Sequence, residues 1–244
     1  MTALPRSARF ACWFTAWVCG RSSLDDARDA IVGADAAHDV VGLDDEPVPL
    51  VLALGRLRGL GAQRAVLSRP VPGDLVGLGG PPAFNVLALD AGEAVVLEGG
   101  GRGLVPSVVG AGVTWQVADA QCPRTLPDLA EADAELRAAL ADSSQRLAEL
   151  DVPRWRPAAE EALRELRSAS DAPLAPGYPP RAQRLAALSL RCDAITALAL
   201  DDDGGAVSAY EAEQRRAALR RLSRSARHAL VAACSAADDP LPTR

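Results

Sequence analysis

Lysine is absent from this chain: all 26 basic residues are arginines, and only two histidines accompany them. Without a side-chain amine the chain cannot form a lysine Schiff base, which excludes pyridoxal-phosphate and lysine-aldolase chemistry. The lysines of Walker A loops and of protein kinases are missing as well, and so are Ser–Lys nucleophile pairs. These absences remove several large enzyme classes.

Aromatic residues are also scarce, at 4% of 244 residues, so the core must consist largely of leucine, valine and alanine. The cysteines are odd in number, scattered and without a CxxC pair, which does not indicate a disulfide framework or a zinc site. We therefore expect a reducing, cytoplasmic compartment, no metal and no cofactor. The five are Cys12, Cys19, Cys122, Cys192 and Cys234.

No long hydrophobic run is present. The apolar stretch Phe10–Val18 follows Arg6 and Arg9 as in a signal peptide, but no small-residue cleavage site follows it. It is also far shorter than the roughly 20 residues that span a bilayer. We expect a buried N-terminal helix and no membrane partner. Because this helix is apolar on two sides, it is either central or part of a homo-oligomer interface.

The composition changes near residue 124, from a Gly-, Val- and Pro-rich half to an Ala-, Leu-, Arg- and Glu-rich half. We expect an α+β part over 1–124 and a helical part over 125–244, with one compact unit as the alternative. The expected strands are Arg64–Ser68, Glu93–Leu97 and Val113–Ala118. They predict a small three-stranded sheet covered by helices.

Hydrophobic periodicity and capping residues predict the helices. In the first half they are Ala8–Val18, a helix between Ser23 and Gly33, Pro47–Leu60 and Ala83–Ala91. In the second half they are Leu126–Leu150, Pro157–Ala169, Arg181–Leu200 and a last helix from Ser208 to Ala236.

The loop Gly73–Pro82 joins an expected strand to an expected helix, a geometry that presents backbone N–H groups to an anion. Its glycine spacing is not GxGxxG, and its two final prolines lack N–H donors. We favour a loop folded over the sheet edge, with a small-molecule or phosphate site as the alternative. The residues of that alternative site are Arg69, Asp74, Gly77, Gly79, Gly80 and Asn85.

The last helix carries a row of arginines on one face, because their spacing is i, i+4, i+8 and i+11. The row consists of Arg216, Arg220, Arg224 and Arg227. We favour internal salt bridges to the glutamates of preceding helices, namely Glu131, Glu135, Glu160, Glu161 and Glu165. An exposed face for an anionic partner, protein or nucleic acid, is the alternative.

Acid–base and metal-binding patterns are weak. His38 lies in the acidic stretch Asp35–Glu46, where we expect it to be solvated, and no G-x-S-x-G elbow occurs. The acidic run from Asp201 fails as a calcium loop, because Gly205 and Ala212 occupy positions that need oxygen ligands.

Three groups of residues are similar to a known group of sequences. They are Pro72–Leu78 with Gly80–Asn85, Ala91–Val95, and Gly177–Arg181 with the later Asp203–Ala206. On these stretches the chain resembles a family of uncharacterised proteins from high-GC actinobacteria. The resemblance implies an origin, and it transfers no activity and no catalytic residue.

The sequence leaves three functions open. A non-enzymatic cytoplasmic protein that acts through protein–protein interaction fits best, largely because no catalytic motif occurs. A ligand-binding protein or enzyme with its site at Gly73–Pro82 is the alternative. Nucleic-acid binding through Arg216–Arg227 comes third and is disfavoured by the net charge of −6.

Overall fold

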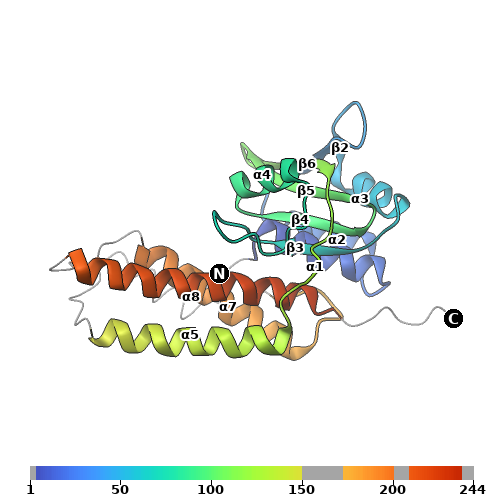
Figure 1. Cartoon of the computed structure of the whole chain (residues 1–244). Coiled ribbons are helices and arrows are strands. Elements are labelled where there is room, and N and C mark those ends of the chain that lie inside the picture. Colours follow the sequence, from blue (N-terminus) through green and yellow to red (C-terminus); the bar gives the residue numbers. More distant parts are fainter. Residues whose placement is uncertain (1–3, 150–172, 201–208, 238–244) are drawn as a thin grey trace. The chain divides into compact units, whose positions relative to one another are not determined.

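A computed structural model describes residues 4–149, 173–200 and 209–237 (Figure 1). The chain divides into two compact units, which we call the sheet unit and the helical unit. Of the described residues, the sheet unit contains 4–126, 174–180 and 234–237, and the helical unit contains the others.

The sheet unit holds four helices and six strands. The helices are α1 (Arg6–Val18), α2 (Leu24–Val32), α3 (Leu50–Gly59) and α4 (Pro82–Ala91). The strands are β1 (His38–Val41), β2 (Val48–Pro49), β3 (Ala62–Ser68), β4 (Ala94–Gly99), β5 (Arg102–Val109) and β6 (Gly112–Asp119). The helical unit contains α5 (Leu129–Glu149) and most of α7 (Pro180–Leu200) and α8 (Ala209–Ser235).

The strands form one six-stranded mixed sheet in the order β2-β1-β6-β5-β4-β3, with β1 parallel to β6 and the other pairs antiparallel. The α+β class and the helical second half are confirmed, but the expected three-stranded sheet is wrong. The three predicted strands are real, and β1, β2 and β5 were missed. Gly103 and Pro106 lie inside β5, and both residue types weaken a strand pattern.

Two predicted helix boundaries have the expected local chemistry. The Ser23 hydroxyl accepts a hydrogen bond of 3.0 Å from the Asp26 amide and so caps α2. Gly33 follows the helix with a positive φ of 58°, which glycine adopts without a steric penalty. Among the described residues, α1, α3, α4, α5, α7 and α8 also match the predicted helices. The predicted helix Pro157–Ala169, Ser208 and the acidic run from Asp201 lie outside the described residues.

Helices α1 and α4 cover opposite faces of the sheet (Figure 1). Phe10 and Phe14 of α1 are fully buried, and the ring centroids of Phe10 and Trp115 are 5.0 Å apart. On the other face, Phe84 and Ala88 of α4 pack in one apolar cluster with residues of β3, β4 and β5. Every residue of α1 is buried or half-buried, so α1 is a central helix of the sheet unit.

Helix α1 also protects the edge strand β3. The Thr15 hydroxyl accepts from the Ala65 amide at 3.0 Å and donates to the Ala65 carbonyl at 3.4 Å. These are backbone groups that an added strand would otherwise pair with. The Thr15 side chain of α1 therefore takes up backbone hydrogen-bonding groups at the edge of the sheet.

In the helical unit, α5, α7 and α8 bury alanine and leucine side chains, including Leu136, Leu185 and Leu222. The Ser143 hydroxyl of α5 donates to the Ala218 carbonyl of α8, at 3.2 Å. No helix within the described ranges is long and apolar enough to cross a membrane.

Candidate functional site

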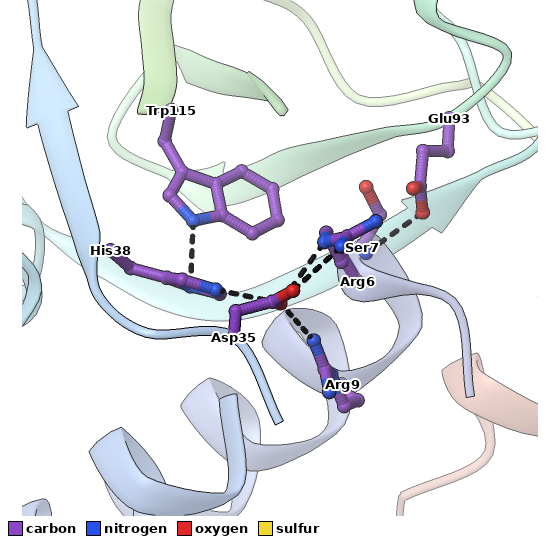
Figure 2. Close-up of polar contacts among 7 residues, drawn as sticks. All are labelled: Arg6, Ser7, Arg9, Asp35, His38, Glu93 and Trp115. Atoms are coloured by element: carbon purple, nitrogen blue, oxygen red, sulfur yellow. Dashed lines mark hydrogen bonds and ion pairs between the residues drawn. The ribbon is translucent and has the colours of Figure 1, made fainter. Parts of the chain in front are cut away.

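The first polar cluster surrounds Asp35, just before β1 (Figure 2). Arg6 forms a two-pronged contact with this carboxylate, through Nε at 3.0 Å and Nη2 at 2.6 Å. Arg9 adds a third donor at 2.8 Å, and His38 Nε2 lies 3.0 Å from Asp35 Oδ2. The carboxylate is only 13% exposed, so it joins α1 to β1 in a mostly buried site.

The sequence interpretation of His38 was wrong, because its side chain is 0% exposed. The indole Nε1 of Trp115 donates to His38 Nδ1 at 3.2 Å, since an indole nitrogen can only donate. The ring proton is therefore on Nε2, which donates to Asp35. Both ring nitrogens are engaged, so His38 has no free lone pair to act as a base. The burial of His38 follows from the pairing of β1 with β6, which the local sequence around His38 does not show.

Electrostatics keep the cluster in a single charge state. The Arg6 hydrogen bonds, assisted by those of His38 and Arg9, hold the pKa of Asp35 well below its usual range. Burial lowers the pKa of His38, and the Asp35 carboxylate opposes this only in part. At neutral pH an ionised Asp35 thus meets two arginines and a neutral His38. This arrangement stabilises the fold and offers no proton for transfer to a substrate at neutral pH.

We expect acid to destabilise the protein through these two groups. Both have lower pKa values in the folded chain, so each stabilises the fold above its unfolded pKa and loses that contribution as the pH falls. The free energy of unfolding should begin to fall below the unfolded histidine value of about 6.5, and again below the aspartate value of 3.8. Urea titrations at half-unit pH steps measure both declines.

A matched pair of variants assigns the first decline. His38→Gln should remove it, whereas His228→Gln, which changes the other histidine, should retain it. A first decline that survives in His38→Gln would contradict the assignment.

The predicted ligand loop is packed against its own unit. A Cβ atom at Gly79 would overlap the carbonyl oxygens of Gln121 and Cys122, and one at Gly77 would overlap the Leu67 carbonyl oxygen. The Ser68 hydroxyl donates to the Val76 carbonyl at 2.8 Å, and the Gly80 carbonyl accepts from the Gln121 amide, also at 2.8 Å. These contacts support a loop folded onto the sheet.

The remaining residues of the predicted ligand site lie around the start of α4. Gly80 has open space where a Cβ would stand. The Asn85 side-chain oxygen is buried and makes no hydrogen bond within the described residues. Arg69 and Asp74 both have interactions within the protein. The ligand site stays a prediction.

Close packing at Gly79 gives a measurable expectation. Gly79→Ala should lower the free energy of unfolding by about 1–3 kcal/mol, because the methyl group overfills a site bounded by backbone. Gly55 of α3 is the matched control, since open space surrounds it. Gly55→Ala should instead raise the free energy of unfolding by about 0.5–1 kcal/mol, through helix propensity. Equal effects in the two urea titrations would contradict the packing shown for Gly79.

The second polar region is a groove between α5 and α8, which we call the α5–α8 groove. It consists of two hollows of about 270 and 410 Å³ that share Asp142 and Arg221. One hollow adds Arg146, Gln214, Ala217 and Ala218, and the other adds Glu135, Ala138, Ala139 and Ser225. Both hollows are lined by the described helices of one unit.

Ion pairs shape the middle of this groove. Asp142 accepts from Arg146 at 3.1 Å, one turn along α5, and from Arg221 of α8 at 3.0 Å. These arginines hold the pKa of Asp142 below its usual value, with the Arg146 hydrogen bond as the largest cause. Two arginines share one carboxylate here, so the groove has the negative Glu135 at one end and a net positive charge at the end that holds Arg146.

The predicted arginine row is on another face of α8. At about 100° per residue, Arg216, Arg220, Arg224 and Arg227 lie roughly 120° around the axis from the groove. Arg220 and Arg224 are exposed, whereas Arg216 and Arg227 are half-buried. Three of the four have interactions within the protein, among them the Arg227 hydrogen bond to Ser223 at 3.1 Å. The α5–α8 ion pair uses Arg221, which lies outside the row.

Comparison with known proteins gives the family. The description "Rv1486c-like protein, N-terminal domain" matches residues 7–135, and "Rv1486c-like protein, C-terminal domain" matches residues 130–231. The chain belongs to the Rv1486c-like protein family. This confirms the resemblance to uncharacterised actinobacterial proteins, and the family descriptions name no activity.

Two relatives of this family come from Mycobacterium tuberculosis. Uncharacterized protein Rv1486c of strain H37Rv is 28% identical over 94% of this chain and 96% of its own length. Uncharacterized protein MT1533 of strain CDC 1551 is 34% identical over 41% of this chain and 43% of its own length. No solved structure matches the Rv1486c-like chain.

Proposed function

We propose that this Rv1486c-like protein is a non-enzymatic protein of the cytoplasm that binds a helix of another protein in the α5–α8 groove. The observation that carries the proposal is the pair of hollows that flank Asp142 and Arg221. Both ring nitrogens of His38 are hydrogen-bonded, which argues against acid–base catalysis at the Asp35 cluster and supports a role in protein binding. Helix-in-groove recognition is a common use of such a surface.

Small side chains favour a helix as the occupant. Ala138 and Ala139 of α5, with Ala217 and Ala218 of α8, line the hollows. Helix axes approach to 8–10 Å depending on the side chains between them, and alanines permit the shorter distances. A partner helix with alanine-sized residues on one face would therefore fit in the groove, over α5 and α8.

The charges at the ends define the chemistry of that helix. Glu135 and Arg146 lie eleven residues apart on α5, which corresponds to roughly 16 Å along the axis. A complementary helix carries a basic residue opposite Glu135 and an acidic residue opposite Arg146, about eleven residues apart on one face. An exposed ion pair contributes only about 0.2–1 kcal/mol, so the charges give specificity more than affinity.

The test uses two fluorescein-labelled helical peptides and the full chain. Both peptides present an alanine face, one with lysine and glutamate eleven residues apart and the other with glutamate at both positions. We expect the lysine–glutamate peptide to bind more tightly in fluorescence anisotropy, by about threefold or more at low salt, with a smaller ratio in 0.5 M NaCl.

Two results would overturn the proposal. One is equal affinity of the two peptides, or binding of neither. The other is a dimer in sedimentation velocity whose formation prevents peptide binding, because a second copy of the chain would then fill the groove.

A small-molecule site at the start of α4 is the second candidate, and the unpaired Asn85 oxygen favours it. This atom accepts hydrogen bonds, so it suits a ligand that carries a hydroxyl or amine donor. Thermal-shift screening with nucleotides, phosphorylated metabolites and sugars tests the site. A ligand whose shift disappears in Asn85→Ala and Asp74→Ala would support it, and an unchanged shift in both variants would oppose it.

A further inference from the structure

One of the two hollows of the α5–α8 groove has an arginine from each helix in its wall. We call it the Arg146–Arg221 hollow, and its volume is about 270 Å³. It is lined by Asp142, Arg146, Gln214, Ala217, Ala218 and Arg221. Pockets that hold drug-sized ligands have volumes of roughly 300–1,000 Å³. The smaller hollow therefore suits a single side-chain group of a partner.

Asp142 orients the two arginines of this hollow. Arg146 Nε donates to both carboxylate oxygens, at 3.1 and 3.2 Å, and Arg221 Nη1 donates to one of them at 3.0 Å. Neither arginine makes another hydrogen bond to a residue that the structure describes. Because a guanidinium has about five N–H donors, most of them remain available for a ligand. Side chains that are held in place in advance also lose less entropy when a ligand binds.

The hollow has a positive charge within a negative chain. Its ionisable side chains are two arginines and one aspartate, which leave one positive charge, whereas the net charge of the chain is −6. Glu135 lies roughly 16 Å along α5 from Arg146, beyond the screening length of about 8 Å at physiological ionic strength. An anion is therefore attracted by the hollow itself and not by the protein as a whole.

We propose that the Arg146–Arg221 hollow receives a phosphoserine of the partner helix, so that phosphorylation of the partner strengthens its binding. The inference rests on the proposed function, because the hollow is part of the groove that the partner helix occupies. A phosphoryl group has a charge of about −1.5 to −2 at pH 7 and three acceptor oxygens. These oxygens can accept from both arginines, including the two-pronged contacts that guanidinium groups form with phosphate. A glutamate has a single charge and two acceptor oxygens, so it makes fewer of these contacts.

Three fluorescein-labelled helical peptides test this inference on the full chain. All have the alanine face and the lysine opposite Glu135, and they differ only in the residue opposite Arg146, which is phosphoserine, glutamate or serine. We expect the phosphoserine peptide to bind about threefold more tightly than the glutamate peptide, and about tenfold more tightly than the serine peptide. Fluorescence anisotropy at low salt and neutral pH measures the three affinities.

Arginine variants show whether the hollow is responsible. Arg221→Gln leaves one arginine to neutralise Asp142, so the preference for phosphoserine over serine should fall to about twofold or less. Arg146→Gln should have the same effect, which guards against a folding defect in either variant. Arg220→Gln is the matched control, because it removes the same charge from an exposed neighbour on another face of α8. It should keep the preference.

The outcomes separate this inference from the proposed function. If the phosphoserine and serine peptides bind equally while the glutamate peptide still binds, the inference is wrong and the proposed function stands. If no peptide binds, both are wrong. A preference for phosphoserine that Arg220→Gln reduces as much as Arg221→Gln would also overturn the inference, because the hollow would then not be its source.

Discussion

Asp35→Ala is expected to lower the free energy of unfolding by about 2–4 kcal/mol. The change removes the carboxylate that pairs with Arg6, Arg9 and His38, and it leaves two arginines facing each other near the buried ring. Breaking a buried ion pair by removing one partner typically costs 3–5 kcal/mol. We discount this figure because Arg6 is 32% exposed and water can solvate it in the variant.

Urea unfolding followed by circular dichroism measures this loss. Asp29→Ala is the matched control, because the Asp29 side chain is 67% exposed and forms its ion pair with the neighbouring Arg28. The control should stay within about 0.5 kcal/mol of the parent chain. Similar losses in the two variants would show that the Asp35 cluster does not hold α1 to β1.

Trp115→Ala should have an equal or larger effect, about 3–5 kcal/mol, because it removes the largest fully buried side chain among the described residues. The indole packs against Phe10 at 5.0 Å and donates to His38 at 3.2 Å. Trp115→Phe separates these roles, since it keeps a ring and removes the donor. Its loss should be about 1–3 kcal/mol, from the unpaired His38 nitrogen and the smaller ring.

The same urea titrations compare the two variants. If Trp115→Phe were as destabilising as Trp115→Ala, the hydrogen bond to His38 and not the packing of the indole would dominate, which contradicts the expected difference. If both changes cost less than about 1 kcal/mol, Trp115 would not be a core residue at all.

Local signals predicted the helices well and the sheet poorly. Ser23 and Gly33 mark the two ends of α2 through contacts with their own neighbours. Four or five residues of sequence therefore contain the signal for each helix end. Strand β1 pairs with β6, whose residues come 75 positions later, and no local pattern reports such a pairing. His38 was interpreted as solvated for the same reason: its burial depends on Trp115 and Asp35 together.

Strand β5 was missed because two of its residues serve tertiary packing. Gly103 leaves room for the Phe84 ring, which a Cβ would overlap, and Pro106 lies opposite Trp115 in the centre of the sheet. Glycine and proline both reduce strand propensity, so the sequence favoured a loop. The α5–α8 groove was missed because helical periodicity assigns faces to single helices and does not say which helices pair. The division of the chain at residue 124 stays a prediction.

We propose that the charges at the ends of the α5–α8 groove select the partner helix. Glu135→Arg makes both ends basic, so it should reverse the preference of the chain. The variant should bind the peptide with two glutamates more tightly than the lysine–glutamate peptide in the anisotropy assay, and Asp90→Arg, the same charge change on α4, should leave the original preference intact. An unchanged preference in Glu135→Arg would contradict the proposed site.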